Sequence, residues 1–113
     1  MAKHNTDGAK AEEKVAGFLQ EAGYKILDTN WKTTWSEVDI IAEKDKCIYF
    51  VEVKYRSSDS AGSGFDYIHA QKLRKMELAA NSWVEMNGWK DEYVLSAAEV
   101  SGSDFEIEFI EQV

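Results

Sequence analysis

The sequence predicts one α/β domain in which a helix, three strands, a second helix and two strands follow one another. Two segments, 8–22 and 66–87, carry apolar residues at helical spacing, whereas the other apolar runs are short and bounded by polar turns, as strands are. The chain has 113 residues, no proline, no internal repeat and no linker, so we expect residues 1–113 to form a single domain with one core.

The first helix is predicted over residues 8–22, because its apolar residues recur every three or four positions. Asp7 can cap its start, and Gly23 can end it. At about 100° per residue, Glu12 lies on the flank of the apolar stripe and looks toward the sheet. Taken alone, Glu12 would be an ordinary glutamate at the edge of a core.

Three strands are expected next. The first begins at residues 24–27 and leads to a turn, and residues 37–43 and 47–56 then form a hairpin.

The register of this hairpin decides which charged residues meet. A two-residue turn at 44–45 and a four-residue loop imply the same pairing, with Asp39 opposite Phe50 and Glu37 opposite Glu52. Asp39 and Glu52 are then diagonal neighbours on one face. A loop of three or five residues would turn Asp39 to the other face.

Asp39, Glu52 and Lys54 stand where apolar residues would otherwise continue the two strands. Charges inside strands are costly unless they are paired or bound to an ion. Glu52 and Lys54 share a face because they are two residues apart. An Asp and a Glu that converge beside a Lys suit a divalent cation such as Mg²⁺ or Mn²⁺ and chemistry on a phosphodiester. The alternative is a solvated hairpin face with an ordinary cross-strand Glu–Lys pair.

The second half of the chain completes the order. Residues 57–64 are polar and should be the most mobile internal segment. A second helix is expected over about 66–87, with Gly88 as its end, followed by strands at 92–100 and 105–110.

The net charge of −8 argues against a tight, non-specific nucleic-acid binder. However, residues 85–113 hold eight acids and one lysine, while residues 1–84 hold 13 acids and 12 bases. The segment with the charged strands is thus nearly neutral, which allows a metal-dependent nucleic-acid contact. One cysteine excludes an internal disulfide, and with two histidines it cannot build a zinc site. No run is long and apolar enough for a membrane span or a signal peptide, so we expect a cytoplasmic protein without a membrane partner.

The chain resembles a known family in its order of elements and in its charged motifs. The order of elements, with Asp on the second strand and Glu-x-Lys on the third, is similar to the PD-(D/E)XK restriction-endonuclease-like superfamily. More narrowly, residues 6–84 resemble the YraN-like family of small bacterial proteins, and more distantly the archaeal Holliday-junction resolvases. The matching text is Gly8-Ala9-Lys10-Ala11-Glu12, Leu19, Gly23-Tyr24-Lys25-Ile26-Leu27, Asn30-Trp31, Glu37-Val38-Asp39-Ile40-Ile41-Ala42, Phe50-Val51-Glu52-Val53-Lys54-Tyr55-Arg56 and Lys72.

The resemblance implies a restriction-endonuclease-like fold, with a mixed central sheet of about five strands flanked by two main helices. It implies that Asp39, Glu52 and the backbone carbonyl of Val53 hold Mg²⁺ or Mn²⁺. Lys54 would orient or activate the attacking water and offset charge on the phosphate. Glu12 would help hold the water or a second ion.

The same resemblance makes Lys72 and Arg56 candidates for phosphate contacts. A homodimer is compatible with the resemblance.

Two departures from the family pattern concern substrate binding. Ser36 stands where the family usually has glycine, and serine would be strained there if φ were positive. The Arg-x-Asp of the fourth strand is replaced by Glu92-Tyr93-Val94-Leu95.

The resemblance therefore predicts a metal-dependent nuclease that cuts DNA, with branched DNA and recombination or repair intermediates as candidate substrates. A catalytically silent module that binds nucleic acid or a protein is the alternative. An unrelated interaction domain with a coincidental motif is a third reading. The intact set of Glu12, Asp39, Glu52 and Lys54 favours the enzyme, because a silent module has no chemical reason to keep all four. The acidic C-terminal quarter favours the silent module.

Overall fold

The structure is a computed structural model, and it describes residues 6–57, 65 and 67–113. Its elements follow the predicted order of helix, three strands, helix and two strands. They are α1 (Thr6–Glu21), β1 (Lys25–Lys32), β2 (Glu37–Lys44), β3 (Cys47–Arg56), α2 (Ala70–Asn87), β4 (Glu92–Ser101) and β5 (Glu106–Ile110). The predicted mobile loop 57–64 lies, apart from Ser57, outside the described residues.

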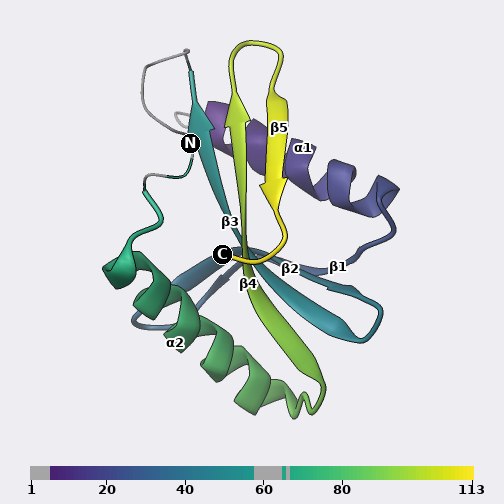
Figure 1. The fold of residues 1–113 in the computed structure, drawn as a ribbon, viewed down its shortest axis with the longest axis vertical. Helices are drawn as coiled ribbons and strands as arrows, with labels where there is room; N and C mark the ends of the chain where they lie inside the picture. The colour runs from purple at the N-terminus through teal and green to yellow at the C-terminus, as the bar shows by residue number, and fades with distance from the viewer. Residues whose placement is uncertain (1–5, 58–64, 66) are drawn as a thin grey trace.

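The five strands form one sheet in the order β1-β2-β3-β4-β5. Every neighbouring pair is antiparallel except β3 and β4, which are parallel and are joined through α2. This is the mixed five-stranded sheet with two helices of the restriction-endonuclease-like fold that the family resemblance implied (Figure 1).

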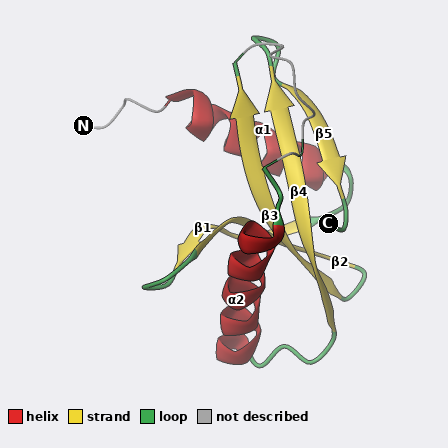
Figure 2. Ribbon diagram, turned by 60° about the vertical axis from the view of Figure 1, so that its left-hand side comes forward, coloured by secondary structure: helices red, strands yellow, loops and turns green. Residues whose placement is uncertain are grey.

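The two helices cover opposite faces of the sheet. On β3, Tyr49 and Val51 pack with α1, whereas Ile48 and Phe50 pack with α2. Residues 38–42 of β2 are all buried, which is the pattern of a strand covered on both faces. Figure 2 shows α2 beside the lower part of the sheet and α1 behind its upper part.

The helix ends explain two boundaries. Gly23 follows α1 with φ of 98°, a backbone conformation that side chains disfavour, so this glycine stops the helix as predicted. Asp7 lies in the first helical turn rather than before it, where its negative charge still suits the positive end of the helix. α2 begins at Ala70 instead of about residue 66, because His69 has an extended backbone and its ring accepts the N–H of Lys72.

The predicted hairpin register is wrong by two residues. Lys44 pairs with Cys47 and Ile41 with Phe50, so Phe50 does not lie opposite Asp39. The turn consists of Asp45 and Lys46, both with positive φ, as type I′ hairpin turns require. A shift by two residues keeps every side chain on its predicted face.

Beyond this hairpin the sheet forks. The pairing of β2 with β3 runs from the turn to Ile40 and Val51. From there β2 continues beside β1, while β3 continues beside β4 as far as Arg56. Figures 1 and 2 both show β1 and β2 splaying away from the upper halves of β3, β4 and β5. The charged residues of the two strands lie at this fork.

No helix among the described residues is long and apolar enough to cross a membrane.

Candidate carboxylate site at the sheet fork

Asp39 occupies the gap where β2 and β3 part. Its carboxylate accepts the N–H of Val53 at 2.8 Å, replacing the main-chain carbonyl that a continuous ladder would supply. The residue is 7% exposed, so this carboxyl is held in place within the protein. The side-chain alternation of β2 predicted the face of Asp39, but only the fork explains how its carboxylate finds a main-chain N–H at this buried position.

Two further acids lie close to Asp39. Glu52 is the next residue of β3 after the last pair with β2, and Glu12 reaches the fork from α1, half-buried. The pKa of Asp39 is raised to about 7, chiefly by burial and then by the negative charges of Glu52, Glu12 and Glu37, while the hydrogen bond from the Val53 N–H opposes the rise. The structure therefore brings together the three acids named from the sequence.

The pKa of Glu12, on the α1 side of the fork, is raised for similar reasons. Burial raises its pKa, hydrogen bonding with Asn30 and Asp39 opposes the rise, and the charges of Glu37 and Glu52 add to it. Two carboxyl groups can hydrogen-bond to each other only when one of them carries a proton. The fork thus favours a bound positive charge, either a proton or a cation.

Lys54 lies two residues beyond Glu52 on the same face of β3, and its side chain is exposed. Its ammonium lies 5.9 Å from the centre of the Tyr67 ring. Lys54 therefore shares a face of β3 with Glu52, and its head group is near the Tyr67 ring and open to solvent.

The two candidate phosphate contacts meet carboxylates in this structure. Lys72, from the first turn of α2, forms an ion pair with Glu52 at 2.8 Å. Arg56 forms a close ion pair with Glu99, a buried residue of β4. Both cations neutralise acids around the fork.

Tyr67 and Glu99 are the neighbours that sequence reasoning missed. The Tyr67 hydroxyl is buried and has no hydrogen-bond partner within the described part of the chain. Burial raises the pKa of Tyr67, and the charges of Glu52 and Glu99 raise it further. An acid inside the otherwise apolar run of β4 was a visible signal for Glu99, whereas nothing in the sequence distinguished Tyr67.

Ser36 is not strained. Residues with positive φ are found elsewhere in the described chain, and Ser36 is not among them. Instead its N–H and hydroxyl contact the Thr33 hydroxyl at 3.1 and 3.2 Å, in the turn between β1 and β2. The concern about serine at this position is therefore removed.

The donor set fits a cation that keeps several water ligands. Across residues 6–57, 65 and 67–113, no three carboxylate, imidazole or thiol side chains are arranged to hold a metal ion on their own. Asp39 uses one oxygen for the Val53 N–H. The resemblance adds the carbonyl of Val53 to the oxygens of Asp39 and Glu52 as a third hard ligand. Mg²⁺ is usually bound through one or two carboxylates with water and phosphate completing its shell. The residues therefore suit Mg²⁺ or Mn²⁺ better than a metal that requires a complete protein cage.

The fold and the acids at its fork define a small α/β protein of restriction-endonuclease-like architecture. Residues 11–108 match the model of a family described as "Uncharacterised protein family UPF0102". The chain belongs to this family, which is the YraN-like family that the sequence resembled.

Individual relatives agree with this assignment. A UPF0102 protein of Flavobacterium psychrophilum is 42% identical over 87 residues, covering 77% of this chain and 73% of the relative. A UPF0102 protein of Helicobacter pylori is 32% identical over 108 residues, covering 93% and 90%. One of Cytophaga hutchinsonii is 27% identical over 109 residues, covering 96% of each chain.

Proposed function

We propose that this protein is a divalent-metal-dependent nuclease that hydrolyses phosphodiester bonds in DNA at the sheet fork. The observation that carries the proposal is the position of Asp39, a buried carboxylate fixed by the Val53 N–H with Glu52 and Glu12 beside it. Like charges at a buried position are unfavourable unless a cation joins them. The nearby exposed lysine, Lys54, is the group such a site needs to meet a phosphate.

Each residue has a distinct role in this proposal. Asp39, Glu52 and the Val53 carbonyl would hold Mg²⁺ or Mn²⁺, which when bound polarises the phosphate and favours an ionised water. Lys54 orients the water or offsets the charge that develops on phosphate oxygens. Glu12 holds a proton or a water ligand at the α1 side of the fork.

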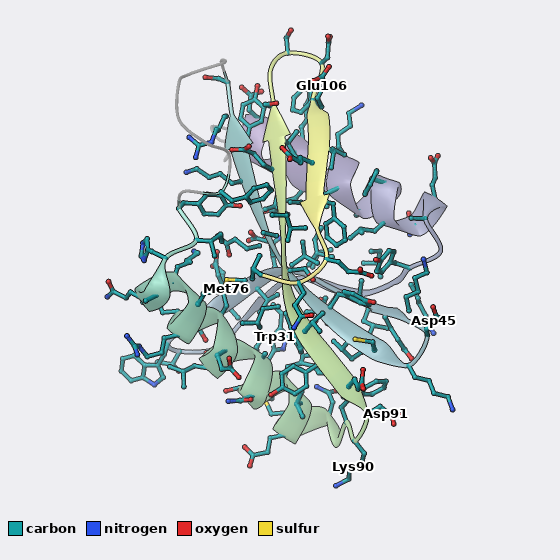
Figure 3. The ribbon with its side chains drawn as sticks, viewed as in Figure 1. Trp31, Asp45, Met76, Lys90, Asp91 and Glu106 are labelled. Atoms are coloured by element: carbon teal, nitrogen blue, oxygen red, sulfur yellow. The ribbon has the colours of Figure 1, made fainter. Side chains whose placement is uncertain are left out.

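The test is cleavage of end-labelled DNA as a duplex, a single strand and a four-way junction, with Mg²⁺, with Mn²⁺ and with EDTA. We expect metal-dependent cutting of at least one form, which Asp39→Ala and Lys54→Ala abolish. Asp91→Asn and Lys90→Ala are matched controls, because both residues are exposed at the connection between α2 and β4 (Figure 3). Absence of cutting with every substrate and both metals would refute the nuclease proposal.

The ion pair between Lys72 and Glu52 supports a second candidate, a silent module of the same fold. This pair neutralises one proposed metal ligand from within the protein. In that case DNA would bind without being cut, and Lys72→Ala would not create activity. Binding without cutting in the same assays would select this function.

A further inference from the structure

A hollow lies directly beside the fork, between the β1–β2 turn and the start of α2. Its volume is about 440 Å³, within the range of small-ligand sites. Glu52 forms part of its wall, so the hollow opens onto the proposed metal site. Its other principal lining residues are Lys32, Trp35, Lys72, Lys75 and Met76.

Trp35 is the unusual member of this wall. It is 87% exposed at the β1–β2 turn, whereas Trp83 is buried and Trp31 and Trp89 are half-buried. The turn is held by the Thr33 hydroxyl, which accepts the N–H groups of Trp35 and Ser36. An indole that is presented to solvent on a hydrogen-bonded turn offers a flat surface for stacking at little entropic cost.

The charges around Trp35 suit a phosphate backbone. Lys32 pairs loosely with Glu37 at 3.9 Å, and Lys72 pairs with Glu52. Lys75 adds a third cation against the two glutamates and has no ion-pair partner among the described residues. The floor is closed by Met76, which reaches from α2 toward the sheet and is 7% exposed (Figure 3).

We propose that this hollow binds an unstacked base of a single-stranded DNA segment, with Trp35 stacking on the base and Lys75 contacting the flanking phosphate. Stacking on an aromatic side chain needs a base that is not already stacked inside a duplex. The hollow would then set which DNA the site takes: single strands, flaps or unpaired regions beside the bond to be cut. The inference rests on the proposed function for its position next to the reacting phosphate.

Binding is measured separately from cleavage. Fluorescein-labelled single-stranded and duplex oligonucleotides of the same sequence are titrated with protein at low ionic strength, in EDTA and in Ca²⁺, and anisotropy is followed. We expect the single strand to bind more tightly than the duplex. Trp35→Ala should weaken single-strand binding by about 5- to 100-fold, the effect of losing one stacked base. Lys75→Ala should weaken it and lower the salt dependence.

Two variants make the test specific. Met86→Ala removes another exposed apolar side chain of α2, 73% exposed and outside the hollow, and should bind as the wild type does. Trp35→Phe should retain most of the affinity but lose the quenching of tryptophan fluorescence that DNA causes in the wild type. Because Trp35 is exposed, neither of its substitutions should unfold the protein.

The outcomes separate the two proposals. If the wild type cuts DNA but Trp35→Ala binds it as tightly as Met86→Ala does, the hollow is not the base site, although the nuclease proposal stands. If no DNA is cut but single-strand binding depends on Trp35, the hollow binds DNA in a silent module. Equal binding of duplex and single strand without fluorescence quenching would overturn the inference, as would no DNA binding at all.

Discussion

Replacing Asp39 with asparagine removes the charge at the fork while nearly preserving the shape of the side chain. The amide oxygen of asparagine can still accept the Val53 N–H that Asp39 accepts at 2.8 Å. The substitution therefore separates the charge of Asp39 from its structural hydrogen bond.

The expected change in folding stability follows from the pKa of this carboxyl group. Burial, followed by the charges of Glu52, Glu12 and Glu37, raises the pKa of Asp39 from 3.8 to about 7. Because the folded pKa lies above the unfolded one, the fold favours the neutral acid. Ionising Asp39 in the folded protein therefore costs stability: this cost is absent below about pH 4, grows between pH 4 and 7 and is complete above pH 7. A difference of roughly three pKa units corresponds to about 4 kcal/mol.

We therefore expect Asp39→Asn to be more stable than the wild type by about 2–4 kcal/mol at pH 8 without metal, and by only about 1 kcal/mol at pH 4.5. For a domain of this size that is a rise in Tm of roughly 10 °C at pH 8. Urea unfolding in EDTA at several pH values measures the difference directly. Mn²⁺ should then stabilise the wild type but not Asp39→Asn, because binding to the folded state alone raises stability.

Asp91→Asn is the control, since Asp91 is exposed and the substitution removes the same charge elsewhere. Parallel stability–pH curves for the wild type and Asp39→Asn would show that the fold does not disfavour the charged form of Asp39. The electrostatic argument for a cation at the fork would then fail.

Three further predictions follow from neighbouring contacts. Lys54→Ala should abolish cleavage but leave calorimetric Mn²⁺ binding intact, whereas Asp39→Ala should lose both; loss of Mn²⁺ binding in Lys54→Ala would contradict its role toward phosphate. Tyr67→Phe removes a buried hydroxyl that has no partner among the described residues. Urea unfolding should therefore show unchanged stability or a gain of about 1 kcal/mol. A loss of stability in Tyr67→Phe would contradict this, because it would mean that the hydroxyl makes a hydrogen bond. Phe50→Ala should lower stability by about 3–5 kcal/mol, because Phe50 is 1% exposed beneath α2, and a loss under 1 kcal/mol would mean that this core is not packed as described.

Much of the architecture was readable in the chain because it depends on local periodicity. Apolar spacing predicted α1 and α2, and glycines at 23 and 88 marked the residues where these helices end. Alternation along β3 placed Glu52 and Lys54 on one face, and the structure agrees. Even the wrong register preserved that face, because an error of two residues leaves a strand's side-chain pattern unchanged.

The register itself was not readable, because the hairpin turn uses Asp45 and Lys46 at positive φ without the glycine or asparagine that usually marks such a turn. The fork was also invisible in the sequence, since it depends on where β2 leaves β3 to follow β1. Asp39 is buried and fixed only because the strands part there.

By itself, the sequence determined which residue types the fold presents: acids and a lysine within strands. The tertiary structure decided their partners. It joined Lys72 to Glu52 and Arg56 to Glu99 across elements far apart in the chain, and it brought Trp35 beside Glu52 around one hollow. The physical reason is that side-chain periodicity is a local property of the backbone, whereas burial, ion pairs and cavities arise only when separate elements pack together.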